Sequence, residues 1–280
     1  MIIRYLSVKS LLVFMCLSLI PVVTWCTEPA TANEIVTHCI RKPGGSDQAG
    51  RLDFTIEKSD GTVTFRRLFH YRWKDYEGSG AAWARLTLLT REPPDNKGTN
   101  YLRWEYTTAS GKTADQWIYL PSAHKVRRLA MRDPRDSDWG IIGEDLQIRQ
   151  RWENNRLLKE EQDGDRLIYH IESVPDNTDS IYGKVITRFV KQDAWDTCVP
   201  WITDFYDRDG QKIKTLTADW SKAGDNWVRD KVVVMNNKTG TRYRYVFSGI
   251  IINNNFSDEQ FSVRNLPRPY VEQPGGQSSR

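Results

Sequence analysis

Residues 115–128 read DQWIYLPSAHKVRR, and the pattern of this stretch underlies the fold prediction. The aromatic and branched residues from Trp117 to Leu120 favour a β-strand, and Pro121 ends it. A basic, strand-like run follows from His124 onward. Two strands joined by so short a link are antiparallel neighbours, so the stretch predicts a hairpin with an apolar face and a charged edge. Whether the apolar face is core or a binding surface depends on the rest of the chain.

The same strand-like pattern recurs along most of the sequence. It covers residues 50–58, 62–73, 83–90, 100–107, 114–120, 124–131, 155–161, 165–173, 183–191, 199–207, 211–219, 227–235 and 241–249. Turn residues rich in Asp, Asn and Gly lie between neighbouring segments at 59–61, 163–164, 209–210 and 237–240, which is a strong signal for hairpins. Short helices are expected near 33–40, near 142–148 and at 257–261, where Ser257 would cap the start. The sequence therefore predicts a mainly β, antiparallel domain.

Alternation of side chains predicts how these strands are buried. Tyr243, Tyr245 and Phe247 share one face of their segment, and arginines occupy the other. This alternation is typical of a sheet with one wetted face. The segment 117–120 is apolar on both faces, so some strands must be covered on both sides. The 11 tryptophans fit either sheet core or an aromatic binding surface.

The first 32 residues have the features of a secretory leader. Two basic residues precede an almost unbroken apolar run at 11–23, and residues 30–32 form a small-x-small motif. We expect cleavage between Ala32 and Asn33 and export of the mature chain to the periplasm. A retained anchor is the alternative, although the run is shorter than the about 20 residues of a membrane span.

Two cysteines, Cys39 and Cys198, follow the predicted leader. An even number in an exported chain favours a disulfide, and two separate thiols are the alternative. A bond between them would close a loop of about 160 residues, with a stabilising effect of about 4–5 kcal/mol on the chain-entropy model. No linker or internal repeat divides the chain, so residues 33–266 are expected to form a single domain. The Pro-, Gly- and Ser-rich residues 267–280 are expected to be a flexible tail.

Several classes of function leave no trace in the sequence. The formal net charge is +4, and the basic residues are spread among acidic ones, unlike the basic stripe of a nucleic-acid-binding protein. No nucleophile-elbow motif and no phosphate-binding glycine loop occur. The four histidines share no motif, and Glu144 and Asp145 would point to opposite faces of a strand. We therefore expect no catalytic residue, no metal site, no cofactor and no nucleic-acid partner, and we do not expect an enzyme.

Three stretches together resemble the outer-membrane lipoprotein-sorting protein family, the relatives of the periplasmic lipoprotein carrier. They read REPPDNKGTNYLRWEY (91–106), DQWIYLPSAHKVRRL (115–129) and GIIGEDL (140–146). In that family a proline- and glycine-containing segment leads into a strand, a Trp-x-Tyr-Leu-Pro strand with a basic continuation comes next, and a Gly-x-Asp/Glu-Asp-Leu segment follows. The resemblance extends from about residue 35 to Leu266. Trp139 stands where the family often has phenylalanine.

The resemblance implies an incomplete antiparallel β-barrel, or half-barrel, of about eleven or more strands, with a few short helices covering a concave apolar face. It implies a periplasmic carrier or binding protein that shields lipids or lipoprotein acyl chains during transfer towards the outer membrane. The expected partners of this monomer are a lipid or acylated protein, an inner-membrane transporter and, transiently, a membrane surface. The alternative is an envelope sensing or accessory module of the same fold that binds an inner-membrane transporter or regulator. A hydrolase of envelope glycans or lipids is the weakest hypothesis.

The hairpin and the strand before it supply the candidate site. The candidates for lipid contact are Leu102, Trp104, Tyr106, Trp117 and Tyr119, and ordinary sheet core is an equally good interpretation of each. The candidates for contact with a headgroup or partner are Lys125, Arg127 and Arg128, at about 1 kcal/mol each near an anionic membrane. The alternative for these three is a charged strand edge that prevents edge-to-edge pairing.

Overall fold

The computed structural model describes residues 30–40, 45–76, 82–107, 110–112, 114–129, 153–174 and 182–269. Met1–Ala30 and Thr31–Arg280 form two separate units, and every element below belongs to the second. The predicted helix near 142–148, nearly all of the predicted leader and most of the predicted tail lie outside the described residues. None of the helices in the described segments is both long enough and apolar enough to cross a membrane.

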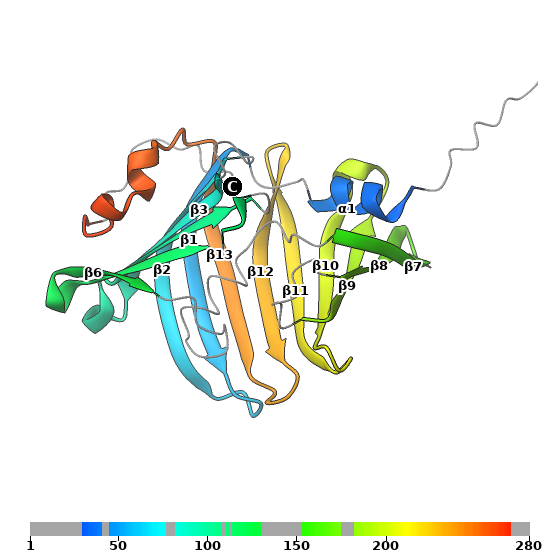
Figure 1. The fold of residues 1–280 in the computed structure, drawn as a ribbon, viewed down its shortest axis with the longest axis horizontal. Coiled ribbons are helices and arrows are strands. Elements are labelled where there is room, and N and C mark those ends of the chain that lie inside the picture. The colour runs from blue at the N-terminus through cyan, green and yellow to red at the C-terminus, as the bar shows by residue number, and fades with distance from the viewer. Residues whose placement is uncertain are drawn as a thin grey trace, which may run out of the picture. The chain divides into compact units, whose positions relative to one another are not determined.

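Thirteen strands form one antiparallel sheet (Figure 1). They are β1 (Asp47–Glu57), β2 (Val63–Asp75), β3 (Ala82–Glu92), β4 (Asn100–Tyr106), β5 (Asp115–Leu120), β6 (Lys125–Leu129), β7 (Glu153–Asp163), β8 (Arg166–Val174), β9 (Lys184–Lys191), β10 (Val199–Tyr206), β11 (Lys212–Ala223), β12 (Asn226–Asn236) and β13 (Arg242–Ile252). Each strand-like segment read from the sequence is one of these strands. The predicted hairpin turns are confirmed, and Gly61 and Gly210 take the positive φ angles, 87° and 79°, that such turns require.

The order of the strands leaves the sheet open. It runs β6-β5-β4-β3-β2-β1-β13-β12-β11-β10-β9-β8-β7, so two meanders are joined where the first strand pairs with the last. β6 and β7 lie at opposite edges, and no described strand pairs beyond either of them. The prediction of an incomplete antiparallel β-barrel is therefore confirmed.

The sheet is curved, and its two faces differ in character. The face of the sheet on which the C-terminal segment lies is called the outer face below (Figure 1). This segment packs on Leu102 and Trp104, so the face that carries these two residues is the outer face. The opposite, inner face holds the main apolar cluster. Its most deeply buried members are Leu52, Phe54, Leu88, Tyr101, Val185, Val232 and Tyr245.

The outer face of β7–β13 and β1 carries several ion pairs between neighbouring strands. Three of them join Arg156 to Glu172 (2.8 Å), Arg188 to Asp204 (3.0 Å) and Arg244 to Glu57 (3.1 Å). In each pair the arginine side chain is partly exposed and the carboxylate is mostly buried. They show that this face is wetted, as the alternation predicted.

The only α-helix among the described residues is α1 (Ala32–Ile40). Its start has a capping box in which Thr31 Oγ1 accepts from the Glu34 backbone N–H (3.3 Å) and Glu34 Oε2 accepts from the Thr31 backbone N–H (2.7 Å). These bonds hold the pKa of the Glu34 carboxyl below its usual range. Cleavage before Asn33 would remove Thr31, so the mature helix would begin without this cap.

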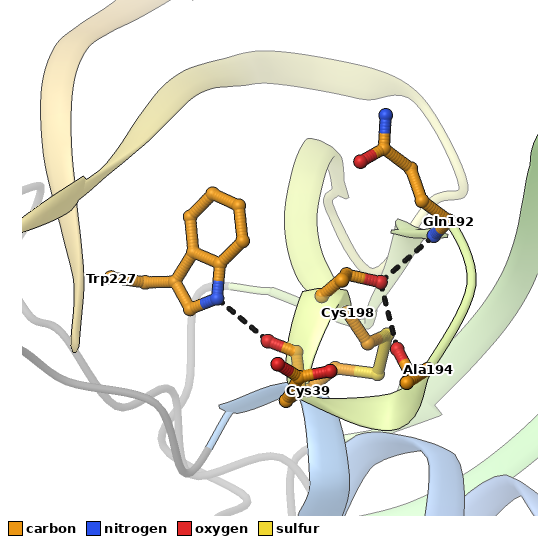
Figure 2. The surroundings of a disulfide bond; sticks show 7 residues. Cys39, Gln192, Ala194, Cys198 and Trp227 are labelled. Atoms are coloured by element: carbon orange, nitrogen blue, oxygen red, sulfur yellow. Dashed lines mark hydrogen bonds between the residues drawn. A yellow bond between two sulfur atoms is a disulfide. The ribbon is translucent and has the colours of Figure 1, made fainter. Parts of the chain in front are cut away.

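A disulfide joins Cys39, near the end of α1, to Cys198, just before β10 (Figure 2). The predicted pairing is thus confirmed. The turn that precedes Cys198 is η5 (Trp195–Thr197), in which Thr197 Oγ1 donates to the Ala194 carbonyl (2.7 Å). From β12, Trp227 Nε1 donates to the Asp196 carbonyl of the same turn (2.6 Å).

The helix is held on the sheet by an aromatic stack as well as by the disulfide. The Trp195 ring stacks on His38 of α1, with centroids 5.0 Å apart, and on Tyr169 of β8, at 5.7 Å. Tyr169 lies opposite Phe189 of β9. Phe189 is two residues from Thr187 along β9, so the two side chains point to the same face. Thr187 lies opposite Thr203 of β10 on the inner face. The helix therefore covers the inner face at the β7–β10 end of the sheet.

The last described segment, residues 253–269, crosses the outer face and is called the strap below. It contains two short turns, η6 (Asp258–Phe261) and η7 (Val263–Asn265). The helix predicted at 257–261 is the single turn η6. The prediction that Ser257 caps it is wrong, because the Ser257 side chain makes no capping hydrogen bond.

Polar anchors fix the strap along its length. Asp47 of β1 accepts from the backbone N–H of Asn254 (2.6 Å), and Lys74 of β2 donates to the Phe256 carbonyl (2.7 Å). In β4, Trp104 Nε1 donates to the Phe261 carbonyl (2.7 Å), and Asn100 Nδ2 donates to the Leu266 carbonyl (2.8 Å). The anchors advance from β1 to β4 as the strap advances from 254 to 266.

Candidate functional site

The inner face offers a set of large apolar side chains that are only half buried. They pack against the margin of the main cluster and come from strands far apart in sequence. The set has five aromatic side chains and two aliphatic ones and is called the inner-face ring set below: Phe65, Trp83, Trp220, Tyr243 and Phe247, with Leu129 and Ile213. Phe247 meets Tyr71 edge to face, with ring centroids 5.4 Å apart. Rings that keep part of their surface free can add apolar contact with a ligand without unpacking the core.

Cations lie over several rings of the inner face. The guanidinium of Arg67 is 4.7 Å from the Phe65 centroid, and Lys214 Nζ is 4.3 Å from the Phe205 centroid. Arg229 lies 5.4 Å from the ring of Trp220. These contacts fall within the range of cation–π attraction. The inner face therefore combines apolar surface with positive charge held close to it.

Buried polar groups of β4 and β5 are paired with one another on the inner face. Arg103 Nε donates to Glu105 Oε1 at 3.1 Å, and the Tyr101 hydroxyl donates to Gln116 Oε1 at 2.8 Å. Burial raises the pKa of Tyr101 to about 12, so its hydroxyl stays protonated at neutral pH. This end of the inner face has structural polar pairs in place of reactive groups.

The structure brings the candidates for lipid contact together, on the outer face. Leu102 pairs across strands with Trp117, and the rings of Trp104 and Trp117 meet edge to face at 4.8 Å. Leu102, Trp104, Trp117 and Tyr119 all pack in one cluster beneath Phe256, Phe261 and Leu266 of the strap. The predicted contact with lipid stays a prediction, and an acyl chain would reach these side chains only if the strap moved.

Tyr106 lies at the end of the same group. Its hydroxyl donates to Asp115 Oδ2 at 2.6 Å, and Asp115 also pairs with Arg128. Burial, followed by the bond to Asp115, raises the pKa of Tyr106 to about 12. These bonds tie β4, β5 and β6 together at the edge of the sheet, so Tyr106 has a structural partner of its own.

The three basic candidates lie on edge strand β6 and are all exposed. Arg127 is opposite Ile118 and Arg128 is opposite Trp117, so the two arginines point to opposite faces. Lys125 points to the same face as Arg127. They therefore do not form one patch, and their predicted contact with a headgroup or partner stays a prediction.

Catalytic constellations do not stand out in the described segments. Those segments contain no group of three or more His, Cys, Asp and Glu side chains that could hold a metal ion. Of the histidines, His38 stacks on Trp195, His124 lies in the turn before β6, and His170 bonds to Glu161 at 3.1 Å. The prediction that the protein is not an enzyme stays a prediction.

Sequence reasoning missed which face the half-buried rings occupy. Alternation placed Tyr243 and Phe247 on one face of their strand, but nothing in that pattern distinguished the inner from the outer face. The strap was also missed as a cover for the outer face. The signal for it was weak: Phe256, Phe261 and Leu266 recur at five-residue spacing in a polar segment, which fits neither a helix nor a strand.

The chain and its fold are similar to several known proteins. A protein-family model described as “Uncharacterized protein” matches residues 84–268, from β3 to the end of the strap. No curated protein gives a significant match. Among solved structures, an outer membrane lipoprotein-sorting protein domain from Vibrio parahaemolyticus is similar, with a TM-score of 0.69 and 22% identity over 85% of this chain and 97% of that chain.

Two further solved structures are similar in fold. A DUF1329 family protein from Desulfovibrio piger has a TM-score of 0.70 and 21% identity over 85% of this chain and 100% of its own. A LolA superfamily protein from Nitrosomonas europaea has a TM-score of 0.57 and 19% identity over 84% of this chain and 99% of its own. At these identities the likeness establishes the fold. The chain belongs to the family of uncharacterized proteins whose model spans residues 84–268, and its fold is that of the lipoprotein-sorting and LolA superfamily structures.

Proposed function

We propose that this protein is an exported carrier or binding protein for lipids or lipoprotein acyl chains, which lie against the inner-face ring set. The observation behind the proposal is the half-buried ring set on the inner face of an open sheet. The fold supports it, because the outer membrane lipoprotein-sorting domain from Vibrio parahaemolyticus has a similar fold. The Cys39–Cys198 disulfide supports export, because such bonds persist in oxidising compartments.

The energetics favour a non-covalent shield. Each methylene removed from water contributes about 0.8 kcal/mol, so a sixteen-carbon chain resists exposure by about 12 kcal/mol. An apolar surface that covers even half of the chain therefore binds it strongly enough for transfer. No bond has to form or break, which agrees with the paired polar groups of the inner face.

Replacing Phe247 with asparagine tests the assignment of the inner face. We expect Phe247→Asn to weaken binding of a fluorescent C16 fatty acid about tenfold, because one ring of apolar contact is lost. The measurement is a titration of the protein with the probe in detergent-free buffer. Thermal melting shows whether the variant is folded. Organic extraction and mass spectrometry of the purified wild-type protein would identify the lipid that it retains.

The adjacent residue provides the matched control. Val246 lies on the same strand, 38% exposed, and points to the outer face. Val246→Asn should therefore leave the affinity for the probe unchanged. Wild-type protein that yields no lipid on extraction and shows no saturable binding of the probe would contradict the proposal, and so would an equal loss in both variants.

A second candidate function is an accessory module that docks on an inner-membrane transporter or regulator. Lys125 and Arg127 favour it, because both are exposed on edge strand β6 and neither has an acidic partner among the described residues. This function predicts capture of an inner-membrane protein by lipid-free protein. Loss of that capture in Lys125→Gln/Arg127→Gln, with Phe247→Asn unaffected, would favour the module over the carrier.

A further inference from the structure

A group of basic side chains lies on the outer face where β1, β2 and β3 meet. Arg51 of β1 is directly opposite His70 of β2, so their Cβ atoms are about 5 Å apart. Arg91, near the end of β3, bonds through Nη1 to His70 Nε2. Ser248 of β13 lies opposite Arg51 on its other side. Together β1, β2, β3 and β13 place two guanidinium groups, an imidazole and a hydroxyl side by side.

The bond from Arg91 fixes the state of the histidine. A guanidinium can only donate, so Nε2 of His70 is the acceptor and its ring proton lies on Nδ1. Burial and then the charges of Arg91, Arg51 and Arg72 lower the pKa of His70 to about 4. The charges of these arginines add to the effect of burial, because the guanidinium groups lie near the imidazole.

The two arginines differ from their neighbours on the same face in having no acid to pair with. Arg66 forms a bidentate pair with Asp53, and Lys74 pairs with Asp258 of the strap. Arg51 and Arg91 are exposed and have no ion pair with any residue that the structure describes. Exposed guanidinium groups kept close together without an acid repel one another, so the arrangement is better satisfied with an anion bound.

We propose that Arg51, Arg91 and the adjacent Ser248 hydroxyl form a phosphate-binding site on the outer face, centred above His70. Two guanidinium forks offer the donors that a phosphate group accepts, and the hydroxyl adds a third. The phosphate belongs either to a lipid headgroup at a membrane surface or to a soluble phosphate compound. The site lies on the face opposite the inner-face ring set, so it does not depend on lipid binding there.

Nuclear magnetic resonance of the imidazole of His70 provides the first test. Inorganic phosphate is titrated into the full-length protein at constant ionic strength, with chloride as the reference salt and His70→Gln to assign the signal. We expect a saturable shift and a rise in the pKa of His70 from about 4, because a bound anion favours the protonated imidazole. The half-saturating concentration should increase about tenfold in Arg51→Gln, which loses charge-assisted bonds to the phosphate.

Lys58→Gln is the matched control, because Lys58 is an exposed cation of the β1–β2 turn with no ion pair in the described chain. It should bind phosphate like wild type. Arg91→Gln should also weaken binding, but it removes the donor to His70 as well, so Arg51→Gln is the decisive variant. Absence of a saturable shift at His70, or an equal loss in Lys58→Gln, would overturn the site.

Vesicles separate the two sources of phosphate. Co-sedimentation of wild type, but not of Arg51→Gln, with phosphatidylglycerol vesicles would identify a lipid headgroup. Phosphatidylcholine vesicles serve as the comparison with no net charge. Saturable binding of inorganic phosphate without sedimentation would identify a soluble phosphate compound. Either result supports the site, and neither depends on the outcome for Phe247→Asn.

Discussion

Replacing both Cys39 and Cys198 with alanine is expected to lower the free energy of unfolding by about 4 kcal/mol. The disulfide spans 159 residues of sequence, so its loss restores much conformational freedom to the unfolded chain. Alanine is the right replacement because both positions are almost fully buried and a serine hydroxyl would lack a partner there. Urea unfolding, monitored by circular dichroism, measures the change in the free energy of unfolding. The slope of each transition checks two-state behaviour.

Reduction gives an internal control for this prediction. A reducing agent should lower the unfolding midpoint of the wild-type protein towards that of the double variant, and it should leave the double variant unchanged. The ring of Trp195 stacks on His38, so the difference in tryptophan fluorescence between the protein and Trp195→Phe reports on α1 separately. A loss below about 1 kcal/mol would mean that contacts of α1 and η5 hold this end of the sheet without the bond.

Local patterns in the sequence were sufficient to locate the strands. Alternation and turn residues are properties of a few adjacent residues, so a strand such as β12, bounded by turns on both sides, can be recognised without its neighbours. The pairing of β1 with β13 could not be recognised in this way. No local pattern between residues 47 and 252 indicates that the first and last strands of the sequence pair in the middle of the sheet. That pairing depends on how both meanders curve.

The candidate site shows the limit of the same reasoning. The structure brings the predicted candidates Leu102, Trp104, Trp117 and Tyr119 together because β4 and β5 pair as neighbours, and their contact with lipid stays a prediction. The segment 117–120 is apolar on both faces, so its pattern cannot distinguish the inner face from the outer one. The distinction comes from the strap, whose Phe261 is 157 residues from Trp104 in sequence. Contacts of such long range leave no periodic signal.

Apolar surface lies on both faces of the sheet. On the outer face the strap already covers the rings of Trp104 and Trp117. The inner-face ring set keeps part of its surface free. If the strap were absent, both faces would offer apolar surface, and an acyl chain could bind on the wrong one. If the proposed function holds, the strap restricts hydrocarbon binding to the inner face, so loosening the strap should change both stability and the binding of a fatty-acid probe.

Replacing Phe261 with alanine is expected to lower the free energy of unfolding by about 3–4 kcal/mol, the cost typical of removing a buried phenylalanine ring. The Phe261 side chain is fully buried in the outer-face cluster, 6.1 Å from the ring of Phe256. Its loss leaves a cavity between the strap and β4 and frees the Trp104 indole to meet solvent. Urea unfolding measures the stability, and binding of an apolar dye measures newly exposed surface.

Two further variants separate packing from anchoring in the strap. Trp104→Phe keeps an aromatic ring but removes the hydrogen bond to the Phe261 carbonyl, so it should cost only about 1 kcal/mol. Glu259→Ala lies in the same turn and is exposed, so it should change stability by less than about 0.5 kcal/mol. In Phe261→Ala the fatty-acid probe should gain a second, weaker class of site, because the outer rings become reachable. A Phe261→Ala protein as stable as Glu259→Ala, with one class of site, would show that the strap neither braces nor covers the outer face.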